Sequence, residues 1–138
     1  MATGSYEPTA TTTRSIYFPL RNGVEIYGGF LGSEATLGER DFAANVTILT
    51  GDLNGNDGSL IYSDNSYHVV FASSVTGAVL DGFTVSAGGG AGGAIDGGGM
   101  YNDASSPTLR NLIFSGNSAT QYGGGMYNGH QGWPTLNN

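Results

Sequence analysis

The sequence contains no cysteine and no lysine, and its only basic residues are four arginines. Without cysteine, no disulfide framework can hold the fold together. The arginines face 11 acidic residues, which gives a formal net charge of −7. Nucleic-acid binding requires a basic surface that displaces counterions from phosphate, so we expect no nucleic-acid partner. Cations and neutral glycans remain compatible with this charge.

Long apolar runs are also missing, because no stretch approaches the length of a transmembrane helix. We therefore expect no membrane insertion. The first residues, Met1-Ala2-Thr3-Gly4, lack the basic and then apolar pattern of a signal peptide. If the parent protein is extracellular or lies on the cell surface, its export signal is expected upstream of this fragment.

The residues that are abundant indicate short strands joined by tight turns. The 25 glycines are separated by short bursts of β-branched and aromatic residues, and no segment has a convincing helical stripe. The only weak helical candidate, 34–42, is interrupted by Gly38. A chain of 138 residues fits one domain. We therefore predict a single all-β domain over residues 1–138 with few or no helices.

A repeat specifies the kind of β-protein. The hexapeptide Gly-Gly-Gly-Met-Tyr-Asn occurs at 97–102 and again at 123–128, and Pro-Thr-Leu occurs at 107–109 and 134–136. A repeat of roughly 20–30 residues in a strand-rich chain is typical of a β-solenoid. The sequence predicts a right-handed parallel β-helix, with its repeat coils clearest in 78–138.

The shared register of the two blocks predicts which side chains stack. We expect Met100 to lie over Met126 and Leu109 over Leu136 inside the solenoid. A sharp turn is expected at Asn111, with its side chain stacked on Asn138 in an amide ladder.

The chain stops before a counterpart of the apolar strand 112–114, so the C-terminal coil is expected to be incomplete. Unpaired strand edges and an uncovered apolar interior are templates for association. We expect a homo-oligomer through this open end, most simply a two-fold dimer.

Several ordered motifs resemble the large right-handed β-helix repeat proteins of bacterial surfaces, within the pectin-lyase-like superfamily. They are Gly-Ser-Tyr-Glu-Pro-Thr (4–9), Arg-Asn-Gly-Val-Glu-Ile-Tyr-Gly-Gly-Phe (21–30), Asn-Val-Thr-Ile-Leu-Thr-Gly-Asp (45–52) and Asn-Ser-Tyr-His-Val-Val (65–70). Many such proteins carry a C-terminal anchor. The resemblance implies the fold and a cell-surface location, and the chain is similar to an N-terminal fragment of that group.

The segment 52–58 is the best metal candidate, because Asp52, Asn54, Asn56 and Asp57 place oxygen ligands close together in the sequence. Hard cations such as Ca²⁺ prefer such ligands. The spacing is not that of an EF-hand, and Asp and Asn also favour plain turns. Calcium is the only cofactor that the sequence suggests, and none is required.

Aromatic residues of the repeat form a second candidate site. If the methionines point inward, Tyr101 and Tyr127 point outward, where together with Trp133 they form a surface that can stack on sugar rings. Stacking of strand tyrosines on each other, coil upon coil, explains the same pattern without a ligand.

Catalysis is left open. The pectin-lyase-like superfamily includes polysaccharide lyases and hydrolases, which use clustered carboxylates, but their motifs are missing here. Glycoside hydrolysis needs at least two carboxylates, and Asp81 and Asp96 are candidates only because they supply that number. We expect Asp81 to be exposed beside the Gly82 turn. The favoured function is a non-catalytic extracellular module for structural or adhesive surface display, with glycan contact. The alternatives are a fragment of a polysaccharide lyase or hydrolase, and a self-assembling scaffold without ligand.

Overall fold

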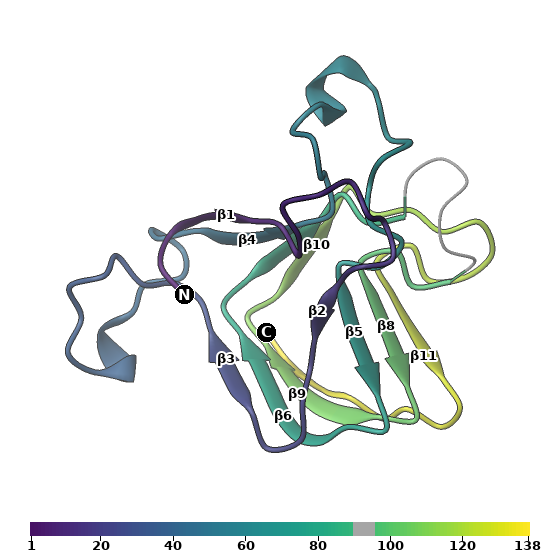
Figure 1. Cartoon of the computed structure of the whole chain (residues 1–138). Coiled ribbons are helices and arrows are strands. Elements are labelled where there is room, and N and C mark those ends of the chain that lie inside the picture. Colours follow the sequence, from purple (N-terminus) through teal and green to yellow (C-terminus); the bar gives the residue numbers. More distant parts are fainter. Residues whose placement is uncertain (90–95) are drawn as a thin grey trace.

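A computed structural model of the chain describes residues 1–89 and 96–138 as a solenoid of four coils (Figure 1). Each coil contributes one strand to each of three parallel sheets, ordered β1-β4-β7-β10, β2-β5-β8-β11 and β3-β6-β9-β12. The prediction of an all-β, right-handed parallel β-helix is confirmed. Apart from strands, the described residues form two single-turn 3₁₀ helices, η1 (Leu37–Glu39) and η2 (Asp57–Ser59).

The strands are short, and their bounds follow the coils in order. The first coil holds β1 (Gly4–Tyr6), β2 (Phe18–Pro19) and β3 (Glu25–Tyr27), and the second holds β4 (Thr47–Thr50), β5 (Val70–Ser73) and β6 (Thr76–Asp81). The third holds β7 (Thr84–Ser86), β8 (Met100–Asp103) and β9 (Ser106–Arg110), and the fourth holds β10 (Ile113–Ser115), β11 (Met126–Gly129) and β12 (Thr135–Asn137).

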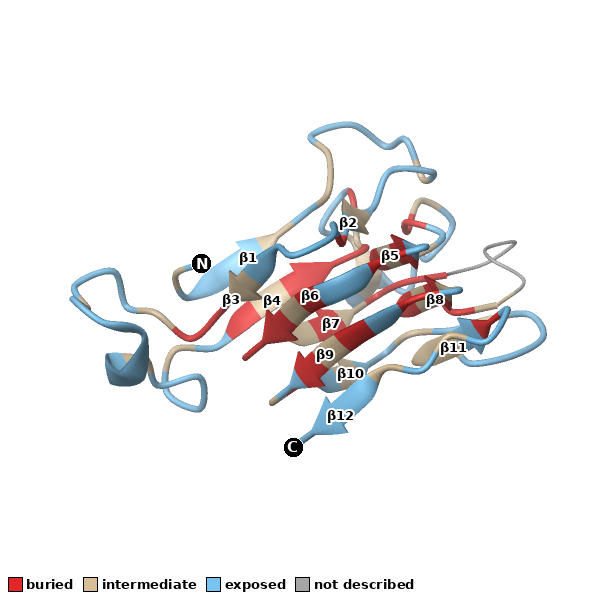
Figure 2. Ribbon diagram, turned by 90° about the horizontal axis from the view of Figure 1, so that it is seen from below, coloured by how far each residue is buried: buried red, intermediate tan, exposed pale blue. Residues whose placement is uncertain are grey.

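Stacked apolar side chains fill the interior, as the repeat predicts. Met126 pairs with Met100 and Leu136 pairs with Leu109 in parallel register. Met100 and Leu109 are fully buried, whereas Leu136 is 61% exposed. Leu136 lies on β12, which is an edge strand, so no further coil of this chain covers it (Figure 2).

The turns that join β6 to β7 and β9 to β10 each contain a residue with a left-handed backbone, and the sharp turn expected at Asn111 is one of them. Gly82 has a φ of 81° and Asn111 a φ of 48°, and these two residue types adopt positive φ most readily. The predicted amide ladder from Asn111 to Asn138 is wrong. The Asn111 side chain donates instead to Asp81 (2.8 Å), and that of Asn138 bonds to the Leu112 backbone.

An asparagine ladder does occur elsewhere in the repeat. Asn102 Nδ2 donates to Asn128 Oδ1 at 3.1 Å and to the Ser105 carbonyl at 2.9 Å. Asn102 is buried, and its amide therefore joins two successive coils through the interior. Asn102 and Asn128 hold the same place in the two Gly-Gly-Gly-Met-Tyr-Asn blocks and pair in strand register.

The connections differ strongly in length from one corner of the solenoid to another. After β5 and β8 the chain turns tightly, but a long segment, 28–46, leaves the third sheet, and further long segments leave the first sheet: residues 7–17, 51–69 and 116–125. The segments that leave the first sheet lie at one corner of the molecule (Figure 1). Because loops on a rigid scaffold are the usual place for binding residues, this corner is where a site is expected.

Candidate functional site

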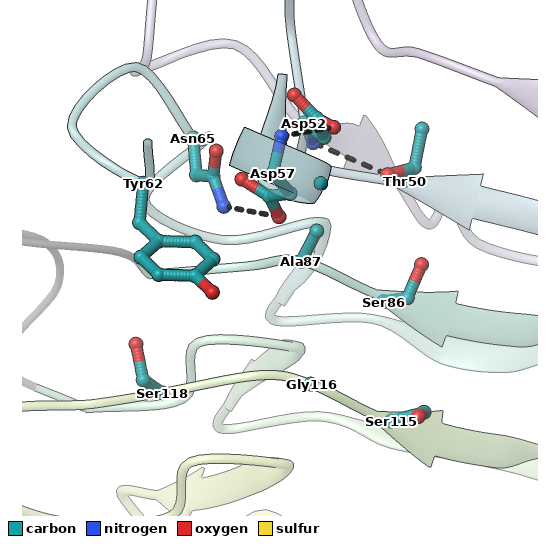
Figure 3. A pocket seen from close by; sticks show the side chains of 11 residues that line it. Thr50, Asp52, Asp57, Tyr62, Asn65, Ser86, Ala87, Ser115, Gly116 and Ser118 are labelled. Carbon is teal, nitrogen blue, oxygen red and sulfur yellow. Dashed lines mark hydrogen bonds between the residues drawn. The ribbon is translucent and has the colours of Figure 1, made fainter. Parts of the chain in front are cut away.

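A groove of about 870 Å³ runs along the corner where the long loops leave the first sheet. Such a volume lies within the usual range for sites that bind small molecules. The β-helix forms the floor of the groove, and the loop after β4 forms a wall (Figure 3). Its lining combines hydroxyl groups, carboxylates and one tyrosine: Thr50, Asp52, Asp57, Gly58, Tyr62, Asn65, Ser86, Ala87, Ser115, Gly116 and Ser118.

The floor of the groove carries a row of hydroxyl groups because three coils end their first-sheet strand in the same way. Thr50 pairs with Ser86, and Ser86 pairs with Ser115, each at the last position of its strand. Parallel strands repeat about every 4.8 Å, so the row follows the solenoid axis at that spacing. Sequence reasoning missed this row, because serine and threonine at strand ends look like ordinary turn residues.

The loop wall is organised around Asp52. Its Oδ1 accepts the Asn56 backbone N–H (3.0 Å) and its Oδ2 accepts that of Asp57 (3.2 Å). The side chain of Leu53 is buried and anchors the loop, while Asn54 is exposed. Of the four residues predicted to hold Ca²⁺, Asn54 is exposed to solvent. Both carboxylate oxygens of Asp52 accept hydrogen bonds from backbone N–H groups of the loop.

Asn56 and Asp57 instead meet residues from the far end of the same loop. Asn56 Nδ2 donates to Asp64 Oδ2 (3.0 Å), and Asn65 Nδ2 donates to Asp57 Oδ2 (3.1 Å). Burial is the main cause that raises the pKa of Asp57; the hydrogen bond from Asn65 lowers this pKa, and the charges of Asp52 and Asp64 raise it further. The predicted calcium binding stays a prediction.

The base of this loop is fixed by an arginine from the first coil. Arg14 Nε donates to the Asn65 carbonyl (2.7 Å), and Arg14 Nη2 donates to the Gly89 carbonyl (2.8 Å). Its guanidinium also lies over the Tyr67 ring, 4.6 Å from the centroid. Arg14 thereby ties three coils together beneath the groove, which fixes the wall at the point where it leaves the solenoid.

The outer face of the second sheet carries a ladder of aromatic rings, with Phe71 beside Tyr101 and Tyr101 beside Tyr127 in strand register. The ring centroids are 5.5 Å and 5.3 Å apart in these two pairs. Tyr17 continues the ladder at one end (4.8 Å from Phe71), and Tyr122 continues it at the other.

The ladder brings together two of the three predicted sugar-binding residues. Tyr101 and Tyr127 are half-buried within it, whereas Trp133 is 76% exposed and, among the described residues, makes no ring contact with the ladder. Phe71 and Tyr101 stack nearly parallel, with 18° between their planes, so each covers a face of the other. This geometry is the coil-upon-coil stacking that stabilises cross-strand pairs. Glycan binding at these three residues stays a prediction.

His68 packs against the ladder as a structural residue. Its ring lies 5.2 Å from Tyr101 and 5.7 Å from Phe71, and its Nδ1 bonds to the Gly97 carbonyl at 2.9 Å. Burial lowers the pKa of His68; the bond to Gly97 and the charge of Asp96 oppose this shift without reversing it. The neutral imidazole is therefore the form that the fold favours.

A pH dependence of stability follows from His68. The unfolded chain takes up a proton near its usual pKa of about 6.5, above the lowered pKa of the folded state. The stabilisation is fully present above the unfolded pKa and is lost as the pH falls through the folded pKa. We expect denaturant unfolding to show lower stability at about pH 5 than at about pH 7.5, with a smaller decrease in His68→Gln. An equal decrease in both proteins would contradict this assignment.

The two carboxylates considered for catalysis lie apart. Asp81 ends β6, and the expectation that it is exposed is wrong, since it is 3% exposed. Its Oδ2 accepts Arg40 Nη2 at 2.6 Å, and its Oδ1 accepts the Asn111 amide. Asp96 lies on the bridge to Tyr122, whose backbone N–H it accepts (3.1 Å). Asp81 is a structural anchor and forms no carboxylate pair with Asp96.

No protein-family model, no curated protein and no solved structure matches the chain. Within the described residues, no helix is long and apolar enough to cross a membrane. The fold is therefore shown by the strands themselves, and the pectin-lyase-like relationship remains a resemblance.

Proposed function

We propose that the chain is a non-catalytic β-helix module of a bacterial cell surface that contacts neutral glycans through the groove beside the 51–66 loop. The row of hydroxyls on its floor carries the proposal. Thr50, Ser86 and Ser115 repeat along the axis, so they suit a linear ligand whose own hydroxyl groups repeat. The extracellular location rests on the resemblance of the motifs to surface β-helix proteins.

The opposite wall supplies the second element that sugar binding uses. Tyr62 is partly exposed and lines the groove on the loop side, across from Ser118 (Figure 3). An aromatic ring offers an apolar face to the C–H groups of a sugar, while hydroxyls and carboxylates accept its O–H groups. The negative charge of Asp52 and Asp57 disfavours acidic polysaccharides, which is why the ligand is expected to be neutral.

The test is binding to an array of neutral oligosaccharides, followed by calorimetry with the best ligand. We expect Tyr62→Ala to weaken binding roughly tenfold, because the ring face is lost while the hydroxyl row remains. Trp133→Ala is the matched control, since it removes an exposed ring that is not part of the groove lining. If Trp133→Ala or Tyr127→Ala abolishes binding and Tyr62→Ala does not, the ligand lies outside the groove. If no glycan binds, the scaffold alternative is preferred.

One observation favours a second candidate, a polysaccharide hydrolase. Asp52 and Asp57 both line the groove, and a raised pKa such as that of Asp57 suits a general acid. The two backbone N–H groups that Asp52 accepts argue against it, because they hold that carboxylate within the loop. Cleavage products of the bound oligosaccharide, lost in Asp57→Asn, would support the hydrolase.

Self-association through the C-terminal end stays a prediction. The edge strands β10, β11 and β12 lie there, and the apolar side chains of Ile113 and Leu136 are exposed on two of them. Unpaired strand edges of this kind can accept another chain. A dimer is compatible with the proposed groove, which opens on the side of the solenoid.

A further inference from the structure

Besides Ser66 Oγ, the loop between β4 and β5 contains four buried amide and carboxylate oxygens that have no hydrogen-bond partner among the described residues. They are Oδ1 of Asn56, Asp57, Asp64 and Asn65. Buried polar atoms are normally paired, because an unpaired oxygen loses its hydration without compensation. Four such atoms in one loop therefore call for an explanation.

These oxygens come from two dipeptides that lie against each other. Asn56 donates its amide N–H to Asp64, and Asn65 donates its own to Asp57, at 3.0 and 3.1 Å. Each amide–carboxylate pair thus uses the amide nitrogen and one carboxylate oxygen, and it leaves the amide oxygen and the other carboxylate oxygen without a partner. The loop brings both pairs together, since 56 and 57 are adjacent in the chain, 64 and 65 are adjacent, and the two hydrogen bonds join these dipeptides.

Asn65 shows most clearly that these oxygens face inward. It is only 2% exposed, and its side chain faces the Asp57 carboxylate (Figure 3). Its Nδ2 is used and its Oδ1 is buried without a partner. A fully buried amide oxygen beside a carboxylate is stabilised by a positive charge rather than by another acceptor.

No cationic side chain in the part of the chain that the structure describes forms an ion pair with these carboxylates. Among the described residues the ion pairs are Arg40–Asp81 and His130–Asp103, and neither includes Asp57 or Asp64. The described residues also contain no cluster of three acidic or imidazole side chains that could hold a metal. A metal here must therefore take half of its protein ligands from amides.

We propose that Oδ1 of Asn56, Asp57, Asp64 and Asn65 binds a calcium ion. Ca²⁺ accepts carboxylate and amide oxygens in flexible geometry and completes its shell of 6–8 ligands with water. Two carboxylates balance its charge, and the four unpaired oxygens become ligands. Asp52, which was predicted as a ligand, positions the loop, and the exposed Asn54 takes no part. Asp57 and Asn65 also line the groove, so the calcium site lies in the loop wall beside the glycan contact.

The experiment follows Ca²⁺ binding to the full chain by calorimetry and by its melting temperature after treatment with chelator. A ligand that binds only the folded state raises its stability, so excess Ca²⁺ is expected to raise the melting temperature. Asp64→Asn keeps an acceptor for Asn56 while removing one charge, and we expect it to weaken Ca²⁺ binding at least tenfold. Asn54→Ala, in the same loop, is the matched control and should bind Ca²⁺ as the unmodified chain does.

The outcomes separate this site from the alternatives. An unchanged melting temperature and no heat of binding with excess Ca²⁺ would overturn the proposal, as would a loss confined to Asn54→Ala. If Asp64→Asn fails to fold, Asp57→Asn provides the same test, because it also retains an acceptor for its partner amide. Since the readout is calcium alone, failure of glycan binding leaves it unaffected.

Discussion

Replacing Arg40 with alanine is expected to lower the free energy of unfolding by about 3–5 kcal/mol, because it leaves a buried carboxylate without its counter-charge. Arg40 Nη2 donates to Asp81 Oδ2 at 2.6 Å, and Nη1 reaches the carbonyls of Asp81 (3.3 Å) and Gly28 (3.4 Å). The guanidinium also lies over the rings of Tyr27 and Phe42. One side chain therefore fixes the 31–46 loop against the first and second coils.

Denaturant unfolding of Arg40→Ala measures the loss, and Arg21→Ala is its control because Arg21 is an exposed arginine without an ion pair among the described residues. Asp81→Asn should restore part of the stability when it is added to Arg40→Ala, since it removes the stranded charge and keeps an acceptor for Asn111. Equal stability of the Arg40 and Arg21 variants would show that the pair contributes nothing.

The coil architecture could be predicted from the sequence because two identical blocks carry their own register. Met100 and Met126 sit at the same place in the repeated hexapeptide, so any solenoid that stacks the blocks must stack these side chains. The turns at Gly82 and Asn111 could also be predicted, because glycine and asparagine are the residue types that adopt positive φ most readily. A sequence repeat of fixed period therefore indicates both the local structure of each coil and which side chains stack between coils.

The contacts between non-repeated segments could not be predicted in the same way. Arg40 and Asp81 come from a loop and a strand in different coils, and nothing in their neighbours along the chain indicates that they pair. Asp81 consequently looked like an exposed turn residue. The pairing of 56–57 with 64–65 could not be predicted for the same reason. Long-range pairing depends on how loops fold back, and single-sequence patterns do not record it.

Gly98→Ala is expected to be the second strongly destabilising change, costing about 3 kcal/mol, at the upper end for overpacking of a core. A Cβ at Gly98 would lie less than 3.0 Å from the Ser118 carbonyl oxygen, and next to the Gly88 carbonyl. These neighbours are backbone atoms of successive coils, which cannot move aside as a flexible side chain can. The glycine is needed because the coils approach each other closely here.

The same motif supplies its own control. Gly124 occupies the equivalent position one coil later, but a Cβ there would meet its nearest atom, the Asn117 carbonyl oxygen, only at 3.2 Å. At Gly38, in η1, a Cβ meets nothing within 4 Å. Thermal unfolding should therefore rank the alanine variants as Gly98 least stable, Gly124 intermediate and Gly38 close to the unmodified chain. Because Gly98 and Gly124 lie in identical hexapeptides, a difference between them reports the backbone that surrounds each glycine rather than the sequence of the motif. Equal losses at both positions would mean that the motif is required for its local conformation rather than for the close approach of the coils.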